Sequence, residues 1–242
     1  MDSQTYYSRI SVMLKNTNDS QLQVIKKVAQ CKANAIKEDK ILHYFGCGHS
    51  LMLCEEVFYR AGGLACMNPI FDPGLMVQHG GVKSSHMEKQ ENYAPFVLDQ
   101  YNLQAGDIFT VFSTSGRNPV PVDAALYARE KGLTVIAVTS MAYSTRVSSR
   151  HSSGKNLHQV ADIVIDSGVD YGDALLDYGA FRAIPGSTIV GAFIINAILA
   201  ETLSLLTKQG FEPPVLISGN IDGGSEKNEK TLAKYRQMIK HL

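Results

Sequence analysis

The sequence has no excess of charge of either sign. Lys and Arg together number 23, Asp and Glu also number 23, and the formal net charge is zero. Proteins that bind a nucleic-acid backbone need a basic surface, which usually shows in this balance, so we expect no nucleic-acid partner. Disordered chains are poor in apolar residues, whereas apolar residues make up 45% of these 242. The composition therefore predicts a folded protein with a full-sized core.

The sequence also lacks the segments that direct a chain to or through a membrane. Its first residues have neither the basic nor the apolar region of a secretory signal. The most apolar stretch, 189–206, is interrupted by Asn196, Glu201, Thr202 and Ser204, so we expect a buried helix there rather than a membrane span. We predict a cytoplasmic protein with no membrane partner.

Motifs for metals, nucleotides and disulfides are absent as well. No two cysteines are spaced as Cys-x-x-Cys, and there is no H-x-x-x-E, no H-E-x-x-H and no G-K-[ST] sequence. We therefore predict no metal, no cofactor and four reduced cysteines. These are Cys31, Cys47, Cys54 and Cys66.

Short apolar runs alternate with segments of helical periodicity, which favours a parallel sheet covered by helices on both faces. The predicted strands are 41–45, 64–67, 108–112, 133–138 and 161–165. The predicted helices are 4–37 with a break at 16–20, 50–61, 88–101, 120–131, 188–206 and 226–239. Residues 68–85 and 140–155 are predicted to be irregular. We divide the chain into an N-terminal helical extension, 1–38, which packs across a partner subunit, and one domain, 39–242.

Three predicted strand ends carry glycine or hydroxyl side chains. They are Gly46–Ser50 with the sequence G-C-G-H-S, Ser113–Asn118 with S-T-S-G-R-N, and Thr139 with Ser140. Ligands of open parallel sheets bind beyond the carboxyl ends of the strands, where loop amides and helix N-termini can hold a phosphate. G-x-G alone is a weak signal, and Ser and Thr are also ordinary turn residues. Three successive hydroxyls before Gly116 are more specific.

These two longer turns resemble those of the SIS (sugar isomerase) phosphosugar-binding family. G-C-G-H-S is similar to the family's G-x-G-x-S turn and S-T-S-G-R-N to its S-x-S-G-x-T/N turn, in the same order. The resemblance covers residues 40–208 and is closest to bacterial SIS-domain proteins grouped with the phosphoheptose isomerases. It implies a three-layer α/β/α fold with a five-stranded parallel sheet, and a homodimer or homotetramer with sites at subunit boundaries.

The resemblance also implies which residues bind a sugar phosphate. The expected phosphate ligands are Ser50, Ser113, Thr114, Ser115 and Asn118. We add three substrate-binding candidates from the same strand ends. They are Gly48, His49 and Ser140.

The sequence departs from the family in one place and extends the likeness in another. Phosphoheptose isomerases and N-acetylmuramic acid 6-phosphate etherases place a Glu ten residues after the first-turn Ser, where this chain has Arg60. His79-Gly80-Gly81 followed by Glu88 and Glu91 is similar to the etherases' A-G-G … E-x-x-E/D segment, in which an acid takes part in acid–base catalysis.

Four residues are candidates for proton transfer. Isomerisation of an aldose or ketose phosphate needs a base beside the carbonyl and an acid at its oxygen. Glu88 is the first candidate base, although a Glu in a first helical turn could equally serve the helix dipole. Glu91 follows on the same predicted face, and His86 and His151 carry imidazoles, a side chain that commonly acts as an acid or a base.

Three functions remain open from the sequence. The one we favour is an isomerase acting on an aldose/ketose phosphate or an amino-sugar phosphate. An etherase or lyase on an amino-sugar 6-phosphate, and a non-catalytic phosphosugar sensor that regulates a partner, are the alternatives.

Overall fold

The computed structural model describes all 242 residues and is built around one parallel sheet. Its strands lie in the order β2-β1-β3-β4-β5, and each of the four neighbouring pairs is parallel. Both faces of the sheet are covered, which is why its strands are continuous apolar runs rather than alternating ones. The predicted α/β fold with five parallel strands is confirmed. The strands are β1 Leu42–Gly46, β2 Met67–Pro69, β3 Ile108–Phe112, β4 Thr134–Thr139 and β5 Ile163–Asp166.

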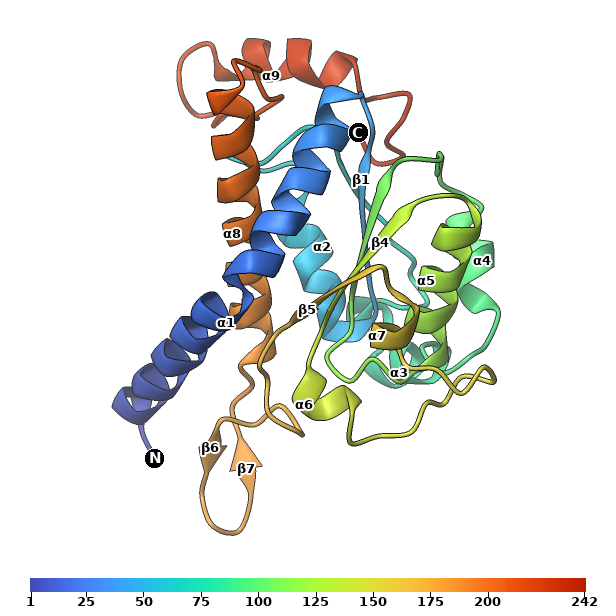
Figure 1. Cartoon of the computed structure of the whole chain (residues 1–242), viewed down its shortest axis with the longest axis vertical. Coiled ribbons are helices and arrows are strands. Elements are labelled where there is room, and N and C mark those ends of the chain that lie inside the picture. Colours follow the sequence, from blue (N-terminus) through green and yellow to red (C-terminus); the bar gives the residue numbers. More distant parts are fainter.

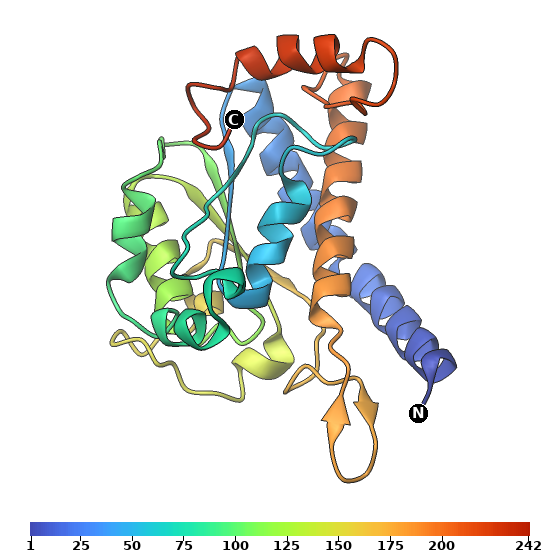
Figure 2. The ribbon, with the colours of Figure 1, turned by 180° about the vertical axis from the view of Figure 1, so that it is seen from behind.

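Helices form a layer on each face of the sheet (Figures 1 and 2). One layer contains α1 (Ser3–Lys37), α2 (Met52–Val57) and α8 (Ser187–Lys208), and the other contains α4 (Tyr93–Leu98), α5 (Pro119–Glu130) and α7 (Leu157–Val160). The helix α9 (Gly224–Ala233) lies across the ends of α1 and α8. Short elements gather near the carboxyl ends of the strands. They are η1 Gly48–Leu51, η2 Val77–His79, α3 Gly81–Met87, α6 Met141–Ser144 and the hairpin β6 Leu176–Asp177 with β7 Arg182–Ala183.

The N-terminal helix is continuous, so the break predicted at 16–20 is wrong. Thr17 and, just beyond this segment, Gln21 bond to the end of β5, while the other polar residues remain on the exposed side of the helix. Thr17 is buried and its hydroxyl donates to the Ser167 carbonyl at 3.2 Å, and the Gln21 side chain accepts from the Asp166 N–H at 3.0 Å. The second half of α1 packs into the core, and the first half projects beyond the sheet (Figure 1).

Three other predicted helices differ from the structure. The predicted helix 88–101 is reduced to α4, because Asn92 adopts a left-handed conformation with φ of 62° just before it, and α3 lies largely in the segment 68–85 that was predicted to be irregular. The predicted helix 50–61 ends at Val57, and the predicted helix 226–239 ends at Ala233. The hairpin β6–β7 was not predicted, since its strands have two residues each and carry no alternating pattern.

Helix α8 meets the length and composition of a membrane span. In this fold one side of it packs against α1 and α2, with Val190, Ile194 and Ile198 buried. A core helix of a soluble protein has the same composition. The helix predicted at 188–206 is confirmed as a helix of the core.

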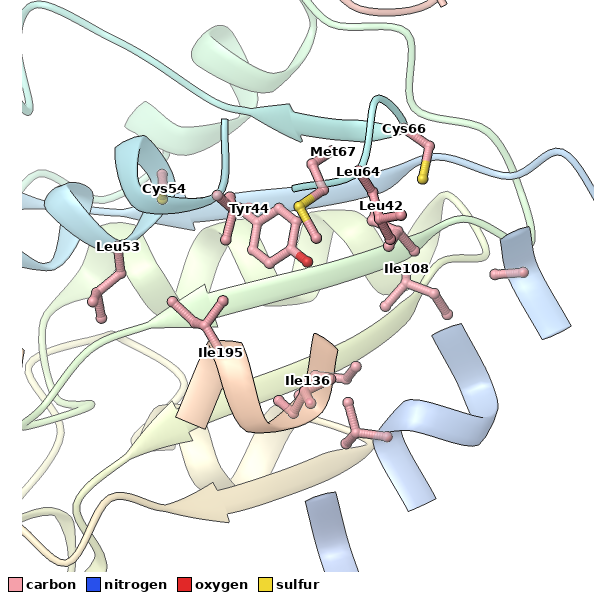
Figure 3. Close-up of a cluster of buried hydrophobic side chains, with 14 of the residues drawn as sticks. Leu42, Tyr44, Leu53, Cys54, Leu64, Cys66, Met67, Ile108, Ile136 and Ile195 are labelled. Carbon is pink, nitrogen blue, oxygen red and sulfur yellow. The ribbon is translucent and has the colours of Figure 1, made fainter. Parts of the chain in front are cut away.

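A lysine is buried in the core beneath α8. Figure 3 shows the surrounding side chains, among them Leu42, Leu64 and Met67. The Lys32 Nζ lies 3.0 Å from the Tyr44 hydroxyl and 4.5 Å from the centre of that ring. No carboxylate pairs with it, and burial lowers its pKa from 10.5 to about 7. The buried ammonium of Lys32 therefore destabilises the folded state.

We expect Lys32→Met to raise the free energy of unfolding by about 2 kcal/mol at pH 6, because burying the ammonium costs several kcal/mol and the orphaned Tyr44 hydroxyl about 1–3 kcal/mol. The unfolded chain keeps this proton up to its usual pKa of 10.5, whereas the folded chain loses it near 7. Stability of the unaltered protein should therefore rise with pH between these values, and the variant should lose that rise. Denaturant titrations at pH 6 and pH 9 measure both effects, and an equal pH dependence in the two proteins would contradict the assignment.

Candidate functional site

A cavity of about 520 Å³ opens where the chain leaves β1 and β3. These two strands are neighbours and end at the same level, since Gly46 pairs with Phe112. The strand order reverses at this point, with β2 on one side of β1 and β4 on the far side of β3. Ligands of open α/β sheets bind at such a switch point, and the volume falls within the roughly 300–1,000 Å³ typical of small-molecule sites.

The first turn brings His49 and Ser50 to the cavity from the helix η1. Gly46 allows this turn to pack closely, because a Cβ there would lie 2.7 Å from the Ser50 carbonyl carbon. Gly48 has a φ of 59°, in the left-handed region that favours glycine. The Ser50 hydroxyl has no partner in the chain, so it can bond to a ligand.

The second turn lines the cavity with Ser113, Thr114 and Ser115. The Ser113 Oγ accepts from the Gly116 N–H at 3.3 Å, which tightens the turn. Gly116 has a φ of 61°, and a Cβ there would lie 2.9 Å from the Thr139 hydroxyl. The backbone N–H groups of Thr114 and Ser115 bond to no other group of the chain. The turn therefore offers free amides and hydroxyls together, which suits an anion.

The N-terminus of α5 contributes less to this cradle than we expected from the sequence. Its first and third residues are Pro119 and Pro121, which have no N–H. The N–H between them, from Val120, donates to the Glu88 carbonyl at 3.2 Å. No early amide of α5 is therefore free to bond to an anion. The free groups at this edge of the sheet are the amides and hydroxyls of the loops.

Glu88 lines the same cavity from the C-terminal end of α3. The alternative that it serves a helix dipole from a first turn is wrong, because it follows the last turn of α3, where the dipole disfavours a negative charge. Burial raises the pKa of its carboxyl group, while the Asn118 side chain and the charges of Lys89 and Arg150 act in the opposite direction. A partly buried carboxyl with a raised pKa is suited to taking up a proton.

Other predicted site residues lie outside the cavity lining. His86 and Glu91 are exposed, and Glu91 accepts a hydrogen bond from the Ser152 N–H. The His151 Nε2 lies 2.8 Å from Asp123 Oδ1, with both side chains nearly buried. Ser140 is fully buried behind the second turn, where its N–H donates to the Thr114 carbonyl at 3.0 Å and its hydroxyl caps α6. The structure brings Gly48, His49, Ser50, Glu88 and Asn118 together with residues 113–115.

The opposite wall of the cavity was missed by sequence reasoning. It comes from α6, the segment after β5 and the start of α8, with Tyr143, Ser167, Asp173 and Thr188 in the lining. Asp173 accepts hydrogen bonds from the N–H groups of Gly186 and Ser187, so its carboxylate caps α8. The sequence did hold one signal for this wall, because Ser167 directly follows β5, a further strand that ends at the same edge of the sheet.

The cavity has no set of metal ligands. Nowhere in the chain do three or more His, Cys, Asp or Glu side chains cluster in a way that could hold a metal ion, and all four cysteines are free. The absence of a metal or cofactor in the functional protein remains a prediction.

Comparisons with known proteins agree on a family. The sequence profile of the SIS domain matches residues 5–140. UPF0309 proteins of Geobacillus thermodenitrificans and Halalkalibacterium halodurans are each 44% identical to this chain, and each match covers 97% of this chain and 95% of the relative.

Solved structures agree on the fold. The phosphoheptose isomerase GmhA of Neisseria gonorrhoeae is 13% identical, with a TM-score of 0.53 over 84% of this chain and 95% of that one. A phosphoheptose isomerase of Francisella tularensis is 15% identical, with a TM-score of 0.52 over 84% of this chain and 100% of that one. At these identities the likeness concerns the fold alone. The chain belongs to the SIS domain family and, within it, to the UPF0309 proteins.

Proposed function

We propose that this protein binds a sugar phosphate in the cavity at the β1–β3 switch point and isomerises it by acid–base catalysis. One observation carries the proposal. The cavity joins a turn with free hydroxyls and amides to Glu88, the one lining carboxylate that does not cap a helix. Membership of a family with phosphoheptose isomerases among its structural neighbours supports the substrate class.

The phosphate is assigned to the two turns. Its oxygens accept from the hydroxyls of Ser50, Ser113, Thr114 and Ser115 and from the free loop amides. The side-chain amide of Asn118 has two N–H donors, so it can donate one hydrogen bond to the ligand and one to the Glu88 carboxylate. A cradle of neutral groups explains how a chain with zero net charge can bind an anion.

Glu88 is assigned as the base. It takes the proton from the carbon beside the sugar carbonyl and delivers it to the former carbonyl carbon, while an acid protonates the carbonyl oxygen and regains a proton from the neighbouring hydroxyl as the new carbonyl forms. His49 is the one imidazole in the cavity lining and is our candidate acid. His86, Glu91 and His151 lie outside the lining, so the proposal gives them no catalytic role.

Hydrogen exchange in deuterated water tests the reaction. The protein is incubated with aldose, ketose and amino-sugar 6-phosphates, and deuterium beside the carbonyl is measured by NMR. Exchange with one of them supports the isomerase. Tight binding without exchange overturns the isomerase in favour of a sensor, and release of a 3-O-substituent overturns it in favour of an etherase. If no phosphosugar raises the melting temperature, the substrate class itself is wrong.

Removing a hydroxyl from the cradle should weaken phosphate binding. We expect Ser113→Ala and Ser115→Ala each to cost about 1.5–3 kcal/mol of binding free energy, since each loses a hydrogen bond to a charged group. Isothermal titration with the phosphosugar found in the screen measures the loss. Ser204→Ala, on the exposed side of α8, is the matched control and should bind as the unaltered protein does. Equal affinities in all four proteins would rule out the cradle.

We also propose a cytoplasmic homodimer or homotetramer with its sites at subunit boundaries. The first half of α1 and the hairpin β6–β7 both project beyond the sheet (Figure 1), and they expose the apolar side chains of Tyr7, Val12, Tyr178 and Phe181. Exposed apolar side chains of this kind favour the association of subunits, which removes them from water. Light scattering on the purified chain distinguishes a monomer from a dimer or tetramer.

A further inference from the structure

The opposite wall of the cavity is held in place by a buried serine hydroxyl. The Ser140 Oγ accepts from the Tyr143 N–H at 3.0 Å, in the first turn of α6, and donates to the Val169 carbonyl, in the segment after β5. Ser140 has no exposed surface. One hydroxyl therefore ties α6 to the segment 167–173, and these two parts of the chain contribute most of this wall.

A carboxylate at each end of that segment fixes the wall further. Asp166 accepts from the Met141 N–H at 3.0 Å and from the Gly168 N–H at 2.9 Å. Asp173 accepts from two backbone N–H groups and from the Ser187 hydroxyl at the start of α8. Both carboxylates are thus engaged within the chain, and no Lys or Arg lines the cavity. The opposite wall is therefore suited to an uncharged part of a ligand.

Two tyrosine rings meet on this wall. The ring centres of Tyr143 and Tyr171 lie 4.7 Å apart, and the ring planes make an angle of 43°. Tyr143 lines the cavity, whereas Tyr171 is 49% exposed at the surface beside it. Contact between the two rings favours one orientation of Tyr143. The cavity is thus offered a flat apolar surface that a second ring supports.

The same wall contains a buried hydroxyl without a partner. Ser167 lines the cavity with only 5% of its surface exposed, and its Oγ bonds to no group of the chain. Its backbone is fully used, because the N–H donates to the Thr139 carbonyl at 2.9 Å and the carbonyl accepts from Thr17 at 3.2 Å. Buried hydroxyls in native proteins are nearly always paired, so an unpaired one beside a cavity points to a ligand.

We propose that the opposite wall binds the sugar of the phosphosugar as a closed ring. The Tyr143 ring stacks on the C–H face of the sugar, and the Ser167 hydroxyl bonds to one of its hydroxyl groups. The proposal rests on the phosphate site proposed above and names the substrate class of that site, which is cyclic phosphosugars of hexose size rather than short open-chain phosphates. The cavity volume of about 520 Å³ leaves room for such a ring beside the phosphate.

The chemistry of the wall favours a ring over an open chain. The C–H groups on one face of a closed sugar ring form a flat apolar surface, and its hydroxyls point outward from the edge. An aromatic ring and a neighbouring hydroxyl match these two features together. An open chain has no such flat face, and it loses more conformational freedom when it is bound.

Two unreactive ligands with the same phosphate test the stacking contact. They are a ring-locked anhydrohexitol 6-phosphate and the open-chain hexitol 6-phosphate, and calorimetry measures the affinity of each. We expect the ring-locked ligand to bind more tightly. Tyr143→Leu should lower its affinity about tenfold and that of the open-chain ligand much less, whereas Tyr143→Phe keeps the ring and should retain most of the affinity. Phe96→Leu replaces an exposed aromatic residue of α4 outside the lining and should change neither affinity.

Ser167→Ala separates a ligand contact from a structural role. We expect it to lower the affinity for the ring-locked ligand about fivefold, since one hydrogen bond is lost. The melting temperature of the free protein should not fall, because the hydroxyl that is removed has no partner there. A structural role would have the reverse signature, with a lower melting temperature and an unchanged affinity.

Neither ligand can react, so these measurements do not depend on whether the protein is an isomerase. Unchanged affinity for the ring-locked ligand in Tyr143→Leu or in Ser167→Ala overturns the proposal. An open-chain ligand that binds as tightly as the ring-locked one also overturns it. In both cases the phosphate site stands if Ser113→Ala weakens the binding of both ligands. Binding of neither ligand by the unaltered protein rejects the phosphate site and the sugar wall together.

Discussion

Glu88→Gln is expected to lower the rate of deuterium exchange by about 10²–10⁴-fold, the usual contribution of a positioned general base. Glutamine has the shape of glutamate, but it cannot take up a proton. Because the phosphate cradle is built by other residues, we expect the melting-temperature shift caused by the phosphosugar to persist. The rate is measured by NMR at saturating substrate, and binding is measured separately by calorimetry.

The control for this variant is a carboxylate outside the lining. Glu55 is exposed on α2 and bonds to the Gln78 side chain at 3.2 Å, so Glu55→Gln should exchange deuterium at the rate of the unaltered protein. Glu91→Gln is the decisive comparison, because the sequence offers Glu91 as an alternative base. Loss of exchange in Glu91→Gln with retention in Glu88→Gln would refute the assignment.

The pH dependence of the exchange gives a separate check on Glu88. Burial raises the pKa of its carboxyl group, so exchange should begin to rise at a higher pH than an ordinary glutamate would allow. The acid limb should disappear in Glu88→Gln, where only a residual rate remains. A pH profile governed by an ordinary carboxyl pKa would show that another acid is the base.

The sheet and the two turns could be predicted from the sequence because local signals specify them. Buried parallel strands are short apolar runs, and the helix that follows each strand fixes the order of layers. The turns could be placed at one edge of the sheet because parallel strands end on the same side. Gly46 and Gly116 are the clearest local signs of the two turns. The backbone packs too closely at Gly46 to leave room for a side chain, and Gly116 has a left-handed conformation that favours glycine.

The environment of the candidate base could not be predicted in the same way. Its position depends on where α3 ends, and that end is set by Asn92 and by the bond from Val120 to the Glu88 carbonyl. The bond from Val120 has no signature in the sequence near Glu88, because Val120 is 32 positions further along the chain. The wall with Asp173 and the bond from Arg150 to Asn118 are also contacts between distant segments. The sequence pattern predicted residues that line the cavity, and it missed the contacts that surround them.

A buried polar network joins β2, β1 and β3 near the ends of the strands that lie away from the cavity. The Asp107 Oδ2 accepts from the His43 Nε2 at 3.0 Å and from the Gln104 N–H at 2.9 Å, and Oδ1 accepts from the Ile41 N–H at 3.0 Å. The other ring nitrogen of His43 accepts from the Asn68 amide at 2.9 Å. His43 and Asn68 have no exposed surface, and they join β1 to β2 while Asp107 joins β1 to the start of β3.

Asp107→Ala is expected to lower the free energy of unfolding by about 3–5 kcal/mol, because it leaves the buried donors of His43 and Ile41, and the partly buried N–H of Gln104, without an acceptor. Burial alone would raise the pKa of Asp107, but the bonds from His43 and the two backbone amides outweigh it, so the pKa is lowered below 3.8. The unfolded chain therefore binds this proton first as the pH falls. The stabilising contribution of Asp107 is complete above pH 3.8 and is lost as the pH falls toward its folded value.

Denaturant titrations at pH 7 measure the loss, with Asp170→Ala as the control. Asp170 is exposed and its nearest cation, on Arg182, is 3.9 Å away, so we expect a change of roughly 0.5 kcal/mol or less. Because β1 and β3 lead into the two turns that we propose to bind the phosphate, partial unfolding at Asp107 should also weaken phosphosugar binding, although this residue is at the opposite end of β3 from the cavity. A variant as stable as Asp170→Ala would mean that the three donors find other acceptors and that the network does not hold the strands in register.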